Sequence, residues 1–175
     1  MVFKKILVAL DHTIQSDEVM MHALDLAQTE NGNLMLIHVL HPEPEPSTNY
    51  FIGVGAFAEL NLYQQATQIR QTQLQKRIED VENWLKAYAQ DAAARGILAE
   101  YIHVVGNPEV EICQIAQQWR ADLIILGRRG RQGLTEFVLG SVSNYVMHHA
   151  PCSALVVQAD AVVSEDRQTT RSVVR

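Results

Sequence analysis

A group of glycines, serines and arginines in the last third of the sequence has the composition of a phosphate-binding loop. The group begins at Gly127, directly after an apolar run, carries three arginines, and reaches a serine-containing helix start at Gly140. Glycines let the backbone approach a phosphate closely, and a helix N-terminus adds unpaired N–H groups and partial positive charge. The three arginines make this stretch positively charged in a chain whose net charge is −6. The group therefore predicts a polyphosphate pocket.

The spacing of these glycines is more specific than their number. Two residues separate Gly127 from Gly130, nine separate Gly130 from Gly140, and Ser141 follows directly. This spacing resembles the G-x2-G-x9-G-[S/T] signature of the nucleotide-binding branch of the universal stress protein family. A glycine-rich connection without a ligand is the alternative interpretation.

The resemblance extends over nearly the whole chain. The opening run 4–11 is similar to the family's first strand, which ends in an aspartate, and the closing run 150–157 is similar to its last strand. Ser153 departs from the family, which usually has a second proline there. The resemblance covers roughly residues 2–158 as a single domain, and residues 159–175 are expected to form a C-terminal tail.

The resemblance implies an adenine-nucleotide site that binds ATP, together with Mg²⁺. The expected nucleotide-binding residues are Ala9, Asp11, Val39, Leu126, Gly127, Arg128, Arg129, Gly130, Gly140, Ser141, Val142 and Ser143. Two of them have a second interpretation. Asp11 either accepts hydrogen bonds from the ribose or base or caps the next turn, and Ser141 is also a candidate helix N-cap.

Catalytic groups are harder to find than binding groups. The sequence has no G-x-S-x-G elbow and no G-K-[S/T] of a Walker-A loop, and no histidine is evidently placed to serve Ser141 as a base. We therefore expect a regulatory or stress-response protein with slow or no hydrolysis. The alternatives are an enzyme that uses the same pocket for ATP hydrolysis or adenylate transfer, and a purely structural dimerisation module.

Composition excludes several other classes. With 175 residues, of which 47% are hydrophobic and 19% charged, the chain suits one compact domain. The acidic balance disfavours nucleic-acid binding, and no apolar run is long enough for export or for a membrane span. Two cysteines, Cys113 and Cys152, lack the neighbours of a metal site and suit reduced thiols in the cytoplasm.

The hydrophobic pattern alternates between buried strands and amphipathic helices. Strands are expected at 3–10, 33–40, 97–105, 122–126 and 153–159, and helices after Ser16, over 59–95, after Asn107 and over 141–149. This alternation predicts a doubly wound α/β domain with a five-stranded parallel, Rossmann-like sheet and helices on both faces. The resemblance implies strand order 3-2-1-4-5, which brings Asp11 and Gly127 together at the switch point.

Two further stretches carry expectations. The proline-rich segment 41–57 is expected to be an extended connector, and its Gly53-x-Gly55 pattern does not follow the first strand as a dinucleotide fingerprint must. Strand five would lie at the sheet edge, where Ala154, Leu155, Val156 and Val157 include no lysine or proline to protect it. Both this edge and the resemblance predict a homodimer formed by antiparallel pairing of strand five; a monomer whose tail covers the edge is the alternative.

Overall fold

The computed structural model describes residues 2–13, 15–42, 56–128 and 139–158, with only the backbone described for 56–63. Most of the predicted extended connector (43–55), the Gly53-x-Gly55 pattern and the C-terminal tail lie outside these residues, as do Arg129 and Gly130. The end of the predicted connector is corrected, because residues 56 and 57 are already helical. The elements in chain order are β1 (Lys5–Ala9), α1 (Gln15–Glu30), β2 (Asn33–Leu40), α2 (Ala56–Ala94), β3 (Ala99–Val105), α3 (Pro108–Trp119), β4 (Leu123–Gly127), α4 (Ser141–His149) and β5 (Ser153–Val157).

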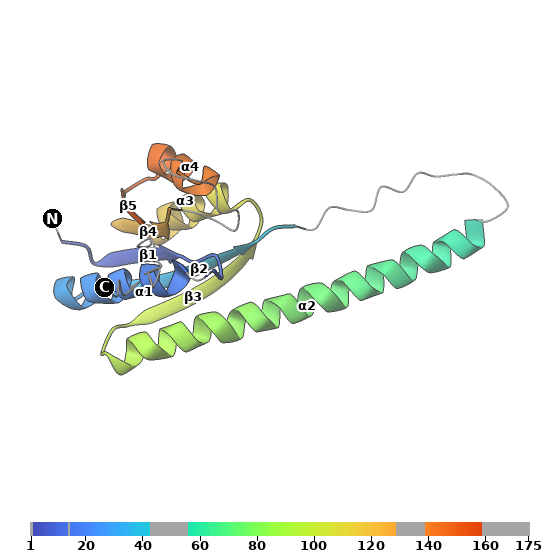
Figure 1. Ribbon diagram of the computed structural model, residues 1–175, viewed down its shortest axis with the longest axis horizontal. Helices are drawn as coiled ribbons and strands as arrows, with labels where there is room; N and C mark the ends of the chain where they lie inside the picture. Colours follow the sequence, from blue (N-terminus) through green and yellow to red (C-terminus); the bar gives the residue numbers. More distant parts are fainter. Residues whose placement is uncertain (1, 14, 43–55, 129–138, 159–175) are drawn as a thin grey trace, which may run out of the picture.

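The five strands form one parallel sheet in the order β3-β2-β1-β4-β5, as predicted. Val8 of β1 aligns with Leu36 of β2 and with Ile125 of β4, so β1 occupies the centre of the sheet. Figure 1 shows α1 and α2 on one face and α3 and α4 on the other. This arrangement is the doubly wound α/β fold that the alternating pattern predicts.

Each face of the sheet has its own hydrophobic core because successive strand residues point to opposite sides. On the α1/α2 face, Ile6 and Val8 of β1 pack with α1 and with Leu85 of α2. On the opposite face, Leu7 of β1 packs with Ile112 of α3 and with residues of α4. All three of these β1 residues are fully buried, which confirms the prediction of a strand covered on both sides.

Two glycines end helices for different reasons. The N–H of Gly32 donates to the carbonyl of Ala27, and a Cβ at Gly32 would lie 2.6 Å from the carbonyl oxygen of Phe3. Gly96 follows α2 with φ of 76°, a left-handed conformation that side chains disfavour. The end of α2 at Ala94 lies one residue before the predicted end at 95.

Several predicted boundaries differ slightly from the structure. α1 begins at Gln15, so Ser16 lies inside the helix and is not its N-cap; its hydroxyl instead donates to Asp11. Asn107 does occupy the N-cap position of α3, but its side chain makes no capping hydrogen bond. β3 begins at Ala99, two residues later than predicted, and β5 ends at Val157, two residues earlier.

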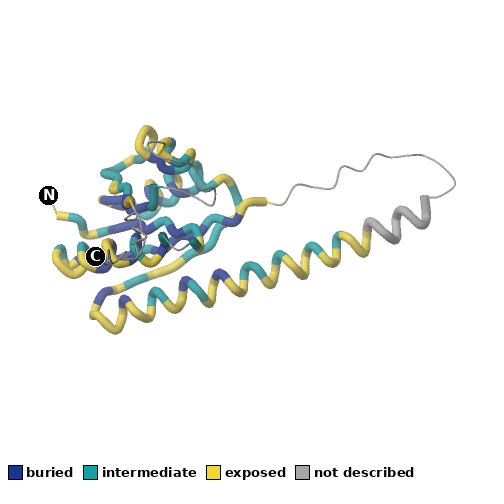
Figure 2. The backbone as a smooth tube through the Cα atoms, in the orientation of Figure 1, coloured by how far each residue is buried: buried dark blue, intermediate teal, exposed yellow. Residues whose placement is uncertain are grey.

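The helix α2 is held by the sheet along only part of its length. An apolar stripe of α2 that includes Val81, Leu85 and Ala92 is buried against β2 and β3. Residues 64–77, which we call the arm, are all exposed or half-buried, and Figures 1 and 2 show α2 extending beyond the domain in this region. No described helix is long and apolar enough to cross a membrane.

Candidate functional site

A cavity of about 620 Å³ lies where the carboxyl ends of β1, β2 and β4 meet. The order β3-β2-β1-β4-β5 puts the switch point between β1 and β4, and ligands of doubly wound sheets bind at such a point. Ten of the predicted nucleotide-binding residues line this cavity: Ala9, Asp11, Val39, Leu126, Gly127, Arg128, Gly140, Ser141, Val142 and Ser143. The sequence therefore predicted which distant residues converge, although their role as ligand contacts stays a prediction.

Asp11 has a structural role that leaves one carboxylate oxygen available. Its Oδ1 accepts hydrogen bonds from the backbone N–H of Thr13 (3.1 Å), the hydroxyl of Thr13 (2.6 Å) and the hydroxyl of Ser16 (3.3 Å). Asp11 thus orders the turn that leads into α1, as one of the two sequence interpretations proposes. Its Oδ2 has no partner among the described residues, so a ligand hydroxyl in the cavity can still donate to it.

The start of α4 supplies backbone donors to the cavity. Gly140 is the N-cap, which corrects the interpretation of Ser141 as the cap, and no side chain caps this helix. The N–H groups of its first three residues, Ser141, Val142 and Ser143, therefore have no partner within the helix. Together with the helix dipole, they give this side of the cavity, which we call the α4 wall, the chemistry that suits an anion.

The hydroxyl of Ser143 is committed to holding this wall in place. The Ser143 side chain is buried, and its Oγ lies 3.0 Å from the carbonyl oxygen of Arg128 and 3.1 Å from that of Gly140. The Gly140 N–H also donates to the Arg128 carbonyl at 2.9 Å. These bonds fasten the end of β4 to the start of α4, so Ser143 offers a ligand its N–H rather than its hydroxyl.

Arg128 lines the cavity while it is anchored to the neighbouring strand. One guanidinium nitrogen donates to Oε1 of Gln158 at 2.9 Å, and its backbone N–H donates to the carbonyl of Val157 at 2.8 Å. A guanidinium has five donors in a planar fork, so the contact with Gln158 leaves donors for a phosphate.

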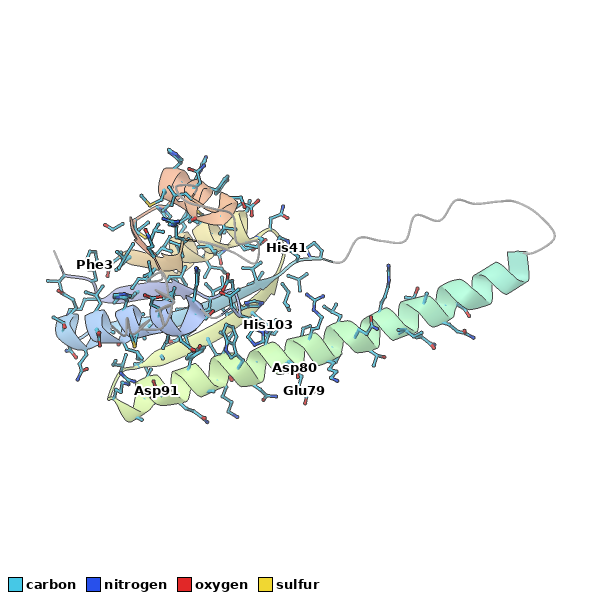
Figure 3. The ribbon with its side chains drawn as sticks, in the orientation of Figure 1. Phe3, His41, Glu79, Asp80, Asp91 and His103 are labelled. Atoms are coloured by element: carbon cyan, nitrogen blue, oxygen red, sulfur yellow. The ribbon has the colours of Figure 1, made fainter. Side chains whose placement is uncertain are left out.

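The opposite side of the cavity, which we call the α1/α2 wall, contains residues that the nucleotide-binding prediction did not include. Gln15 and Ser16 come from α1, His38 and His41 from β2 and its end, and Arg77 from α2 (Figure 3 labels His41). The buried Oε1 of Gln15 has no hydrogen-bond partner among the described residues. No local motif marks these positions, because they are brought together by packing alone.

Three histidines, His12, His38 and His103, have partners within the protein, and of these three only His38 lines the cavity. The ring of the buried His38 bonds the carbonyl oxygen of Leu10 at 2.8 Å through Nδ1. His12, in a left-handed conformation beside Asp11, packs against Trp84 with ring centroids 4.5 Å apart. His103, which lies on the α2 side of β3 in Figure 3, is 3.3 Å from Glu82. None of these three contacts joins a nucleophilic side chain to a base.

The two cysteines lie on the α3/α4 face, away from the α1/α2 wall. Both pack against the second core as free thiols. Burial raises the pKa of the Cys113 thiol, and burial together with the charge of Asp122 and Cys113 raises that of Cys152. A raised pKa lowers the thiolate fraction, which describes packing residues rather than nucleophiles.

Comparisons with known proteins agree with this fold. Residues 2–158 match the universal stress protein family. The chain is 37% identical over 158 residues to universal stress protein Sll1388 of Synechocystis, which covers 89% of this chain and 98% of the relative. It is 31% identical over 156 residues to universal stress protein YxiE of Bacillus subtilis, covering 89% of this chain and 99% of that protein.

Solved structures share the fold at lower identity. MJ0577 superposes with a TM-score of 0.72 at 23% identity, over 92% of this chain and 99% of that one. A universal stress protein from Archaeoglobus fulgidus in complex with dAMP superposes with a TM-score of 0.59 at 18% identity, over 89% of this chain and 98% of that one. With the family match across its whole sheet, this chain belongs to the universal stress protein family.

Proposed function

We propose that this protein binds an adenine nucleotide, ATP in the first instance, in the cavity at the switch point and acts as a stress-response regulator. One observation carries the proposal: the uncapped N-terminus of α4 and the carboxylate of Asp11 line the same cavity. The N–H groups suit phosphates, and a free carboxylate oxygen suits ribose hydroxyls. The complexes of related universal stress proteins with cAMP and dAMP support an adenine ligand.

The proposed ligand includes Mg²⁺, which would arrive with the phosphates. The described residues include no group of three or more His, Cys, Asp or Glu side chains that would hold a metal by themselves. Mg²⁺ commonly keeps several waters and binds through one or two carboxylates plus substrate phosphates. In the proposed complex the phosphates and waters would supply most ligands of Mg²⁺, so the described residues need not hold the metal by themselves.

Mass spectrometry and calorimetry test the proposal together. Small molecules released from freshly purified, denatured protein are expected to include an adenine nucleotide. Titration of nucleotide-free protein with ATP and Mg²⁺ is expected to give a micromolar dissociation constant, which corresponds to a binding free energy of about −8 kcal/mol. A folded protein that neither carries an adenine nucleotide nor binds ATP at millimolar concentration would contradict the proposal.

We propose further that turnover is slow and that the protein works in the cytoplasm as a binding protein. A positioned general base ordinarily contributes about 10²–10⁴-fold to a rate, and the described cavity residues provide no evident nucleophile–base pair. Steady-state ATPase activity is expected below about one turnover per minute, far under typical enzymes. Sustained hydrolysis or adenylate transfer that survives extensive purification would select the enzyme instead.

A homodimer through β5 is part of the same proposal. β5 pairs only with β4 among the described strands and ends the sheet, and Leu155 is 41% exposed. Antiparallel pairing with a second copy would satisfy the outer backbone groups of Ala154–Val157. Light scattering is expected to show a dimer of the unmodified protein at micromolar concentration. The variant Val156→Pro is expected to be a folded monomer. A monomer for the unmodified protein would refute the interface.

A further inference from the structure

The helix α2 has two parts with different surroundings, and Arg77 lies between them. From Ile78 onward, residues of the apolar stripe pack against the core of the α1/α2 face, where Val81 and Leu85 are buried. Before Arg77, no arm residue is buried, and Ile69 is 57% exposed. An unsupported helical segment is marginally stable in water and frays on its own.

Arg77 is nevertheless part of the cavity wall. It lines the same cavity as Gly140 and Ser141, although α2 lies on the opposite face of the sheet from α4. Arg77 is half-buried and engages in an interaction within the protein. Its guanidinium has five donors, so it can keep that interaction and still donate to a phosphate.

The less exposed face of the arm continues from Arg77 toward the helix start. Thr67, Arg70 and Leu74 are half-buried, whereas the arm residues between them are exposed. The spacing of these residues with Arg77 alternates between three and four, which places them on one side of the helix. A contact at Arg77 therefore acts on the less exposed face of the arm.

We propose that Arg77 contacts the phosphates of the bound nucleotide and thereby couples occupancy of the cavity to the stability of the arm. This inference rests on the proposed nucleotide site and adds its regulation. An arginine–phosphate contact at the base of the arm lowers the free energy of the helical state most strongly next to Arg77. The stabilisation declines toward the helix start, because fraying begins at the far end.

Two variants with the same change in charge test the proposal. Arg77→Gln removes the guanidinium, and Lys76→Gln removes one positive charge from the neighbouring exposed position. Arg77→Gln is expected to weaken ATP binding by about 5- to 10-fold, and Lys76→Gln by less than about 2-fold. Adenosine, which has no phosphate, is expected to bind the unmodified protein and Arg77→Gln equally.

Hydrogen exchange of the arm provides a readout that a purely structural arginine would not change. Saturating ATP is expected to slow exchange of amides 71–77 by at least about 3-fold in the unmodified protein, with less effect on 64–70. In Arg77→Gln at saturating ATP, this protection is expected to disappear, while Lys76→Gln retains it.

Each other outcome overturns a stated part of the inference. Equal ATP affinity of Arg77→Gln and the unmodified protein excludes the phosphate contact. The contact is also excluded if Arg77→Gln lowers the affinity for adenosine as much as the affinity for ATP. Unchanged protection of the arm in Arg77→Gln excludes the coupling. Failure of the unmodified protein to bind ATP would instead defeat the proposed function itself, so the two failures are distinguishable.

Discussion

The two walls of the cavity are built by different means. The α4 wall offers backbone N–H groups from consecutive residues after Gly140, held in place by the buried hydroxyl of Ser143. The α1/α2 wall offers side chains, such as Gln15 and Arg77, from two helices far apart in the sequence. The N–H groups of the α4 wall are present whatever the side chains are, but a bulky side chain beside them would block the approach of a ligand. The donors and acceptors of the α1/α2 wall, by contrast, are lost or altered by single substitutions.

The largest expected effect comes from adding bulk to the α4 wall. Gly140 has φ of −58°, which valine can adopt, so Gly140→Val should fold normally. Its side chain would obstruct phosphate approach to the N–H groups of α4, and ATP affinity is expected to fall by at least about 100-fold, or about 2.7 kcal/mol. Calorimetry measures the loss, and circular dichroism checks the fold.

A matched control separates obstruction from a general cost of valine. Ala87→Val adds bulk to an exposed position of α2, remote from the cavity, and should leave ATP affinity unchanged. If folded Gly140→Val binds ATP as the unmodified protein does, the α4 wall is not the phosphate site.

An intermediate effect is expected where the two walls meet, at Asp11. Asp11→Asn keeps an oxygen for the turn into α1 but removes the charge that strengthens hydrogen bonds from ribose hydroxyls. Adenosine affinity is expected to fall by about 5- to 10-fold, about 1 kcal/mol. Asp25→Asn, an equal change of charge on the exposed side of α1, is the control. Calorimetry that finds no difference between the two variants would assign Asp11 to the turn alone.

The smallest effect concerns the attachment of α2 to α1. The Tyr88 hydroxyl donates to Asp17, and burial, followed by this hydrogen bond and the charge of Asp17, raises the tyrosine pKa above its ordinary value. Because the site is largely exposed, Tyr88→Phe should lower the free energy of unfolding by less than about 1 kcal/mol at neutral pH. ATP affinity should stay within about 2-fold, because the variant retains the packing of α2.

The pH dependence of the Tyr88 variant has a definite sign. A tyrosine whose folded pKa is raised stabilises the protein fully below its unfolded pKa of 10.0, and this contribution is lost as pH rises through the folded pKa. Denaturant unfolding should therefore show a difference in the free energy of unfolding between the unmodified protein and Tyr88→Phe at pH 7. This difference should become smaller well above pH 10.0. Tyr101→Phe, on β3 and 41% exposed, is the control. If the difference in the free energy of unfolding grows as the pH rises above 10.0, the stabilising role of the Tyr88–Asp17 hydrogen bond is contradicted.

Periodicity predicted the elements because it follows from local geometry. The continuous apolar run of β1 and the stripes of α1 and α3 reflect burial against the sheet, and all were read from spacing alone. Boundaries moved by one to three residues, and the helix predicted over 59–95 already begins at Ala56. The start of α1 is one example, because Gln15 enters the helix before the predicted cap at Ser16.

The sequence by itself determined the α4 wall, because its donors belong to one short contiguous stretch whose glycine and serine spacing is specific. The strand order was available only through the resemblance, and the sheet then confirmed it. Only the tertiary structure decided that Gln15, His41 and Arg77 share the cavity. Their convergence depends on how α1 and α2 pack on the sheet, and no local pattern encodes that. The same packing stops at Ile78, which is why the preceding part of α2 projects from the domain as an arm.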